Sequence, residues 1–405
     1  MKWKTAILSD ISTNIQTGPF GSQLHQSDYS IEGTPVVMPK DLVNGHISEA
    51  TIARISDAHI ERLNRHKIEI GDILYSRRGD VGRCAFATEK EAGWLCGTGC
   101  LRVSTDVSKA NPKFVFYQLQ KPDTIGWVEK HAVGATMLNL NTAILSRVPI
   151  EIPSLNTQNR IVDILSAYDN LIENNQKQIK LLEEAAQRLY KEWFVDLRFP
   201  GYEITPVVDG VPEGWELCRL EDVIEFNPKI PLSKERLKQS VPMSALSTSS
   251  MTLDTEEFAA TFSNSGSKFQ NGDTLLARIT PCLENGKTAF VAGIESDEGA
   301  VGSTEFIVMR SKGINPYMVY LLARDDSFRQ SAINSMTGSD GRQRAQADKL
   351  KALPYLKPTD QITRLFAGYA EPIFLQIQKK NEQNVRLRQA RDRLLPKLMS
   401  GEIEV

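Results

Sequence analysis

The sequence predicts an α+β fold in which two similar mixed domains are separated by two long helices that form a coiled coil. Three observations support this prediction: an internal duplication, two sustained heptad patterns, and short β-rich runs that alternate with glycine turns. The expected segments are a first domain (1–153), a first spacer helix (154–199), a second domain (200–358) and a second spacer helix (359–405). A chain of 405 residues is long enough for each domain to have its own core.

The duplication is visible as landmarks that recur in the same order in the two halves of the chain. The matched pairs are Gly71-Asp72 with Gly272-Asp273, Gly82-Arg83 with Gly286-Lys287, Asn111-Pro112 with Asn315-Pro316, Pro149 with Pro354, and Pro153 with Pro358. Ordered matches with a small drift in spacing are typical of a duplication followed by short loop insertions. A short helix is expected after each Asn-Pro pair, over 112–120 and 316–324.

Residues 281–288, PCLENGKT, are close to a phosphate-binding loop, which would need a glycine at the first position. Pro281 stands there instead, and proline has no backbone N–H to offer a phosphate. The duplicated counterpart, GRC at 82–84, has no such loop, and β-rich runs flank both segments. We therefore expect a hairpin turn that carries a cation in each copy.

Two helical segments carry mostly apolar residues at alternating steps of four and three, which is typical of a coiled coil, although the middle of the second is polar. The first seam is Ile161, Leu165, Tyr168, Ile172, Asn175, Ile179, Leu182, Ala186, Leu189 and Trp193. The second is Ile362, Phe366, Tyr369, Ile373, Gln376, Lys380, Gln383, Leu387, Ala390 and Leu394. If the helices are antiparallel, the polar centres at Asn175 and Gln376 could meet, and Gly368 with Pro372 predicts a kink or break. The alternative is two ordinary amphipathic helices, each packed on its own domain.

Composition and motifs exclude several classes of protein. Five cysteines form no even disulfide framework and are expected in a reducing cytoplasm, and no apolar run is long enough for a membrane span. The sequence has no zinc-protease, nucleophile-elbow or dinucleotide-binding motif, and its five histidines have no metal spacing. We expect a chain that is not an enzyme and that binds no metal or cofactor itself. The net charge of −2 excludes a uniformly basic coat but allows a local basic surface.

Two similar domains on a rigid spacer are comparable to a dimer fused into one chain, and dimeric DNA readers engage two half-sites. Four stretches of the sequence resemble the specificity subunits of type I restriction–modification systems. They are TGPFGSQLHQSDYSIEGTPVVMPKDLVNGHI (17–47), GDILYSRRGDVGRCAF (71–86), the helical stretch 148–199 and the ending LLPKLMSGEIEV (394–405). The resemblance covers nearly the whole chain and is weakest in the second domain.

The resemblance implies that each domain is a target recognition domain for one half of an interrupted site in double-stranded DNA. It implies that the helices form an antiparallel coiled coil on which two methyltransferase (modification) subunits dock, with restriction/translocase subunits joining them. S-adenosylmethionine would then belong to the methyltransferase subunits, and ATP with Mg²⁺ to the restriction subunits.

Side chains that read base edges are chiefly Arg and Lys for guanine and Asn and Gln for adenine. The candidate DNA-binding residues are Lys40, Asn44, Arg77, Arg78, Arg83, Arg278, Lys287, Arg342, Gln343 and Arg344. Each of them has the alternative of being a solvated surface residue, and the loops 134–141 and 338–346 are equally compatible with anchoring domain to helix. Two other functions stay open: a coiled-coil scaffold without DNA binding, and a nucleotide-dependent enzyme that uses residues 281–288.

Overall fold

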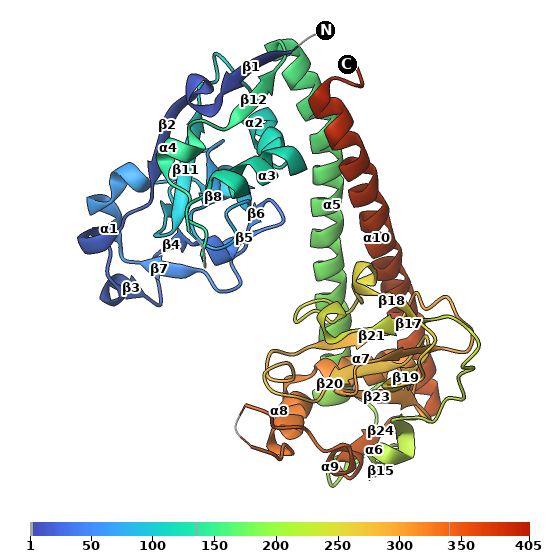
Figure 1. Cartoon of the computed structure of the whole chain (residues 1–405). Coiled ribbons are helices and arrows are strands. Elements are labelled where there is room, and N and C mark those ends of the chain that lie inside the picture. The colour runs from blue at the N-terminus through green and yellow to red at the C-terminus, as the bar shows by residue number, and fades with distance from the viewer. Residues whose placement is uncertain (1–2, 135–136, 340) are drawn as a thin grey trace. The chain divides into compact units, whose positions relative to one another are not determined.

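The computed structural model of the chain forms two compact units, each of which combines a globular part with segments of two long helices (Figure 1). The described residues are 3–134, 137–339 and 341–405. The first unit is Met1–Leu171 together with Leu387–Val405, and the second is Ile172–Arg386. The division into four functional segments stays a prediction.

The globular part of the first unit contains two four-stranded sheets. The antiparallel sheet has the order β2 (Ser12–Thr17), β11 (Cys100–Thr105), β8 (Ile73–Ser76), β9 (Cys84–Phe86). The mixed sheet has the order β10 (Leu95–Cys96), β4 (Thr34–Val37), β7 (Ala53–Ile55), β3 (Tyr29–Ser30), with β10 and β4 parallel. A separate antiparallel pair joins β1 (Lys4–Ile7) to β12 (Pro149–Ile152).

The second unit repeats this plan. Its antiparallel sheet has the order β16 (Ile224–Phe226), β23 (Phe306–Ser311), β20 (Thr274–Ala277), β21 (Thr288–Phe290). Its mixed sheet has the order β18 (Ala259–Thr261), β17 (Lys238–Val241), β22 (Ala300–Gly302), β19 (Ser267–Phe269), with β17 and β22 parallel. The counterpart of the terminal pair joins β15 (Glu216–Arg219) to β24 (Pro354–Lys357). The predicted α+β class is confirmed.

The Asn-Pro pairs begin short helices, as expected. The Asn111 side chain accepts hydrogen bonds from two first-turn N–H groups of α2 (Pro112–Leu119), and the Asn315 side chain accepts one, from Met318 N, in α7 (Pro316–Arg324). Asparagine satisfies N–H groups that have no partner within the helix, and proline at the first helical position loses no bond.

The two long helices are α5 (Leu155–Tyr190), which continues into a π-helical turn (Lys191–Val195), and α10 (Asp360–Ser400). α10 runs unbroken through Gly368 and Pro372, so the break that the sequence offered as an alternative to a kink does not occur. Gly368 is exposed, so the carbonyl that loses its partner at Pro372 lies on a solvent-facing part of the helix. Among the residues described, no helix is both long and apolar enough to cross a membrane.

The first predicted seam is correct, since each of its positions on α5 is buried or half-buried. The second seam is only partly correct beyond Phe366, because Tyr369, Gln376 and Gln383 are exposed. Its other later positions are half-buried: Ile373, Lys380, Leu387, Ala390 and Leu394. The buried positions of α10 in the second unit are Ile362, Phe366, Ala370, Phe374, Ile377 and Asn384. This shift by one residue follows from Phe374, whose ring packs 4.8 Å from that of Tyr317 in the same unit.

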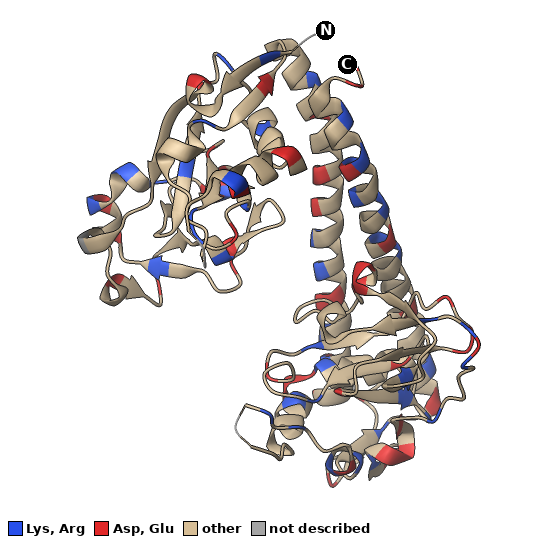
Figure 2. Cartoon of the chain, viewed as in Figure 1, with Lys and Arg blue, Asp and Glu red and all other residues tan. Residues whose placement is uncertain are grey.

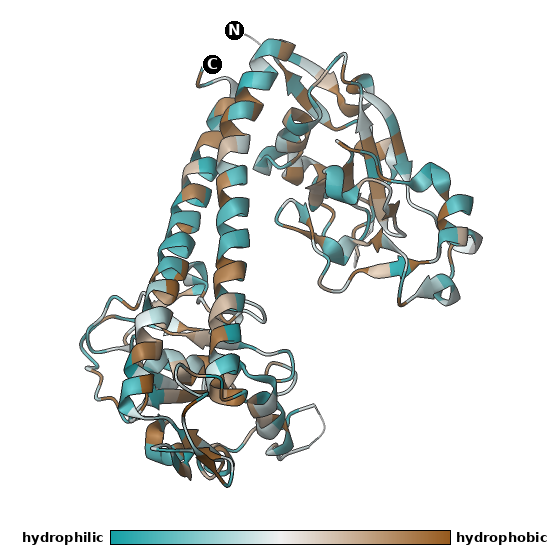
Figure 3. Cartoon of the chain, turned by 180° about the vertical axis from the view of Figure 1, so that it is seen from behind, coloured by the Kyte–Doolittle hydropathy of each residue, from teal (hydrophilic) through white to brown (hydrophobic). Residues whose placement is uncertain are grey.

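Within each unit the two long helices are antiparallel neighbours. In the first unit Ile161 and Leu165 of α5 share a core with Leu395 of α10. In the second unit the buried Asn175 amide donates to Asn384 Oδ1 at 3.0 Å, and to Gln383 beside it. The sequence suggested that Asn175 meets Gln376, but its polar partners are Asn384 and Gln383. Hydrophobic and hydrophilic bands alternate along both helices (Figure 3).

Candidate nucleic-acid interface

Arg77 lies directly after β8, at the start of the hairpin turn in the first unit. Its backbone N–H donates to Gly99 O at 2.8 Å, and its carbonyl accepts from Leu140 N at 2.8 Å. The guanidinium carbon lies 5.7 Å from the centroid of the Phe20 ring, which is within cation–π range. The arginine is thus fixed between a strand, a loop and an aromatic ring.

Arg278 occupies the same position after β20. Its backbone N–H donates to Glu305 O at 2.9 Å, and its carbonyl accepts from Ala345 N at 2.8 Å. Its Nε lies 3.8 Å from Glu305 Oε2, and Arg344 binds the same carboxylate through Nε and Nη2 at 2.8–3.0 Å. The hydrogen bonds from Arg344 hold the pKa of Glu305 below its ordinary value.

Hydrogen bonds also attach the predicted loops to these arginine segments. Gly79 N donates to Leu138 O in the first unit, and Thr280 N donates to Gln343 O in the second. The loops therefore lie against the hairpin starts, although residues 135–136 and 340 within them lie outside the described residues. Gln343 itself is half-buried, whereas Arg342 is exposed.

The other candidates of the first unit lie on turns. Lys40 donates to a loop carbonyl at 2.7 Å, and Asn44 has a φ of 50°, which suits a tight turn. The turn that holds Asn44 adjoins β9, since the following glycine accepts from Phe86 N. Arg78 is exposed, and Arg83 is bound to Asp80 at 2.8 Å.

The segment 281–288 leads into a hairpin, as the sequence predicted. The strands β20 and β21 pair antiparallel on either side of it, and so do β8 and β9 in the first unit. Gly286 has a φ of 75°, a conformation that favours glycine. Lys287 turns inward and donates to Met243 O at 2.9 Å. This arrangement does not support a phosphate site.

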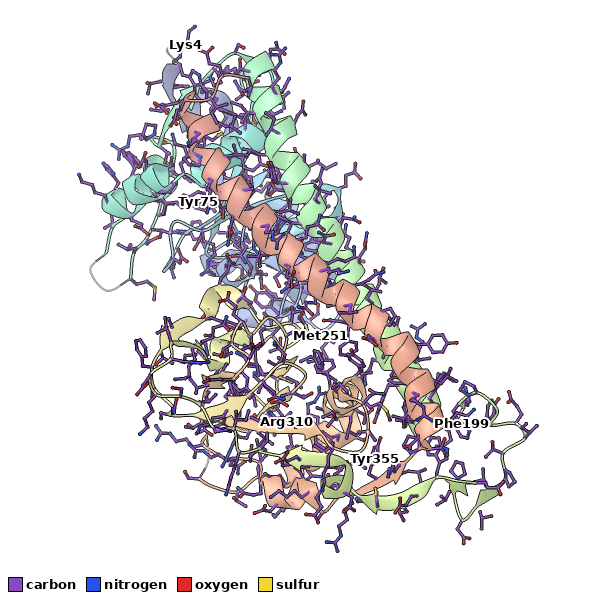
Figure 4. The ribbon with its side chains drawn as sticks, turned by 90° about the vertical axis from the view of Figure 1, so that its right-hand side faces the viewer. Lys4, Tyr75, Phe199, Met251, Arg310 and Tyr355 are labelled. Atoms are coloured by element: carbon purple, nitrogen blue, oxygen red, sulfur yellow. The ribbon has the colours of Figure 1, made fainter. Side chains whose placement is uncertain are left out.

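A buried aspartate at each Gly-Asp landmark fixes the strand that carries the arginine. Asp273 is 1% exposed and accepts two hydrogen bonds of 2.7 Å from Arg310, which Figure 4 labels in the second unit. Asp72 accepts from Ser104 at 2.6 Å and lies 3.4 Å from Arg102. Burial raises the pKa of Asp72. Both carboxylates are tied to neighbouring strands of the sheet, which indicates a structural role.

Sequence reasoning missed Phe20, Glu305 and the lysines at 229 and 268. With Arg278, the two lysines line a cavity of about 600 Å³ in the second unit. Phe20 lies in the stretch 17–47 that carries the resemblance, but nothing in its local sequence marks it as a neighbour of Arg77, and nothing local distinguishes Glu305 from other surface acids. Lysine and arginine are interspersed with acidic residues over both units (Figure 2).

Three of the five cysteines, Cys84, Cys96 and Cys100, are buried. Burial raises the pKa of Cys84 and Cys96 to about 12, which favours the neutral thiol. All five cysteines are free. Within the described part of the chain, no three His, Cys, Asp or Glu side chains gather in a way that could hold a metal ion.

Comparison with known proteins gives a consistent result. The family model for the type I restriction modification DNA specificity domain matches residues 2–184. The type I restriction enzyme MjaIX specificity subunit of Methanocaldococcus jannaschii is 25% identical over 92% of this chain and 87% of its own length. The HindI specificity subunit of Haemophilus influenzae is 22% identical over 99% of both chains.

A solved structure supports the fold. The crystal structure of the type I restriction–modification S subunit from M. genitalium superposes with a TM-score of 0.58 at 16% identity, covering 98% of this chain and 96% of that one. The matched sequences, the duplicated domains and the paired helices agree with one another. Residues 2–184 thus carry the type I restriction modification DNA specificity domain, and over nearly its whole length the chain is similar to the specificity subunits of type I restriction–modification systems.

Proposed function

We propose that this chain gives a type I restriction–modification complex its DNA specificity, and that each globular domain reads one half of an interrupted site in double-stranded DNA. In this proposal the chain performs no chemistry. It docks two methyltransferase subunits, which bind S-adenosylmethionine, and joins restriction/translocase subunits, which use ATP and Mg²⁺.

One observation carries the DNA-reading part of the proposal. Arg77 and Arg278 stand at the same backbone position in the two copies, and in each the Nε atom is buried without a hydrogen-bond partner among the described residues. An unsatisfied buried donor is unusual in a folded protein, and it shows that the guanidinium is not fixed by a structural hydrogen bond at that nitrogen. This suits a side chain whose outer nitrogens bind a ligand. Arginine is the side chain that pairs most often with guanine in the major groove.

The duplication supports two half-sites of different sequence. The antiparallel sheets have the same order, yet the side chains around the two arginines differ: Phe20 in the first unit, and Glu305 with Arg344 in the second. Base choice depends on such neighbours as well as on the arginine itself.

A modified-base map of the source cell's DNA, with and without the gene, tests the proposal. We expect a split motif that loses methylation when the gene is removed. Arg77→Gln should then change one half of the motif and Arg278→Gln the other, whereas Arg219→Gln, at an exposed ion pair with Glu221, should change neither. An unchanged map in the presence of active methyltransferase would favour a scaffold without DNA binding.

DNA affinity of the purified complex gives an independent readout. Binding that depends on phosphate contacts weakens steeply as salt rises. A scaffold would show no affinity for duplex DNA at any salt concentration.

A further inference from the structure

The two copies hold their matched arginines by different means. In the first unit the residue that faces Arg77 across the strand pair is Gly99, which has no side chain, and the guanidinium lies over Phe20. In the second unit the facing residue is Glu305, whose carboxylate is 3.8 Å from Arg278 Nε. The arginine therefore has the same backbone position in both copies, but its side chain contacts an aromatic ring in the first and a carboxylate in the second.

Every side-chain nitrogen of Arg344 has a hydrogen-bond partner within the protein. Its Nε is 3.0 Å from both carboxylate oxygens of Glu305, its Nη2 is 2.8 Å from Oε1, and its Nη1 donates to Arg342 O at 3.4 Å. A bidentate pair of this kind fixes the plane of the carboxylate as well as its position. Arg344 thus orients Glu305, and each of its nitrogens has a partner in the chain.

Arg278 is held less completely. Its separation from Glu305 is that of an ion pair and not of a hydrogen bond, and its side chain is 30% exposed. It lines the cavity of about 600 Å³ that Lys229 and Lys268 also border. The charge of Glu305 orients the Arg278 guanidinium, which lies beside a basic cavity. Its remaining N–H groups can donate to a ligand that has two adjacent hydrogen-bond acceptors. In duplex DNA, guanine O6 and N7 form such a pair.

We propose that Glu305 is a positioning residue for base recognition, which holds Arg278 in the orientation that recognises a guanine in the half-site of the second domain. This inference rests on the proposed function and adds the residue that determines specificity. In the first domain Gly99 stands at the position of Glu305, so no carboxylate there orients Arg77. The two domains therefore differ at this position in the residues beside the arginine, and not in the arginine itself.

The test uses Glu305→Gln in the assembled complex with its methyltransferase partners. The rate of methylation is measured on duplexes in which each base pair of the wild-type motif is replaced in turn. We expect discrimination for one G·C pair in the second half-site to fall roughly tenfold, as when a bidentate contact is lost. Every position of the first half-site should keep its wild-type discrimination.

Asp348→Asn is the matched control, because it also removes a carboxylate from an ion pair in the second unit, with Lys351 at 2.7 Å. It should leave the whole profile unchanged. Arg344→Gln is a second route to the same effect, since it releases Glu305 without removing it, and it should weaken discrimination at the same base pair.

The outcomes are distinct. A loss spread evenly over all positions would show that Glu305 only supports the fold, and an unchanged profile in both variants would also overturn the inference, while the proposed function would stand in either case. A wild-type complex that shows no split motif would remove the proposed function and this inference with it.

Discussion

Replacing Asp273 by asparagine should destabilise the second unit more than any matched change at its surface. The carboxylate is 1% exposed and accepts from Arg310 Nε and Nη2 at 2.7 Å and from Gln270 N at 2.8 Å. An asparagine amide offers one oxygen and an NH₂ group to the same fork, so one donor of Arg310 would face another donor.

The loss in the free energy of unfolding can be estimated from this geometry. Breaking a buried ion pair from one side costs about 3–5 kcal/mol, because a charge is left without its partner. The Arg310 side chain is 22% exposed and keeps some contact with water, so the lower end applies, about 3 kcal/mol. With a urea dependence of about 2 kcal/mol per molar, the midpoint for the second unit should fall by about 1.5 M.

A urea titration of the full chain, combined with hydrogen exchange of peptides from β20, assigns the loss to the correct unit. Asp348→Asn at the surface should leave the midpoint unchanged. Asp72→Asn should shift the first unit by less, because Arg102 lies 3.4 Å from Asp72 and also donates to the carbonyls of Lys67 and Arg65, so it keeps partners when the carboxylate is lost. If Asp273→Asn shifts the midpoint by under about 0.5 M, solvent replaces the ion pair and the reasoning is refuted.

Three further predictions concern the second unit. Asn384→Leu should cost about 1–3 kcal/mol in the same titration, because the buried Asn175 amide loses one of its two acceptors, and adding Asn175→Leu should restore much of the loss. The purified chain should bind no ATP in isothermal titration calorimetry, since Lys287 already donates to a backbone carbonyl; heat of binding that Lys287→Ala abolishes would contradict this. The pKa of Glu305 is depressed below its usual 4.5, so its stabilisation by Arg344 is present above pH 4.5 and is lost as pH falls through the folded pKa. Unfolding midpoints of the wild type and of Glu305→Gln should therefore differ at neutral pH and converge in acid.

Local signals allowed the parts of this fold that depend on neighbouring residues to be predicted. Asn111 and Asn315 cap helices because their side chains reach N–H groups two or three residues away. Gly286 suits a turn because its φ is positive, and the strands on either side pair as a hairpin. Repetition strengthened these predictions, since the same signals occur in both copies.

Features that depend on tertiary contacts were not predictable in this way. The register of α10 shifted because Phe374 packs on the rings of its own domain, and periodicity alone cannot weigh that contact against a heptad seam. Glu305 meets Arg344 from 39 positions away, and neither residue carries a local mark of the pairing. The DNA-binding role of the ten candidate residues stays a prediction.

The first unit is assembled from two separated stretches of chain, and this affects how the protein is made. Gln118 donates to Met399 O across 281 positions, and Leu395 and Leu398 complete the core that Ile161 begins. At about 5–20 residues per second, translation of the intervening second unit leaves that core unfinished for roughly 10–40 s. The second unit is continuous in sequence, so all of it is synthesised before the carboxy-terminal residues that complete the first unit. The later half of the gene product is therefore free to fold first, and the nascent amino-terminal half must be kept from aggregating until the last helix emerges.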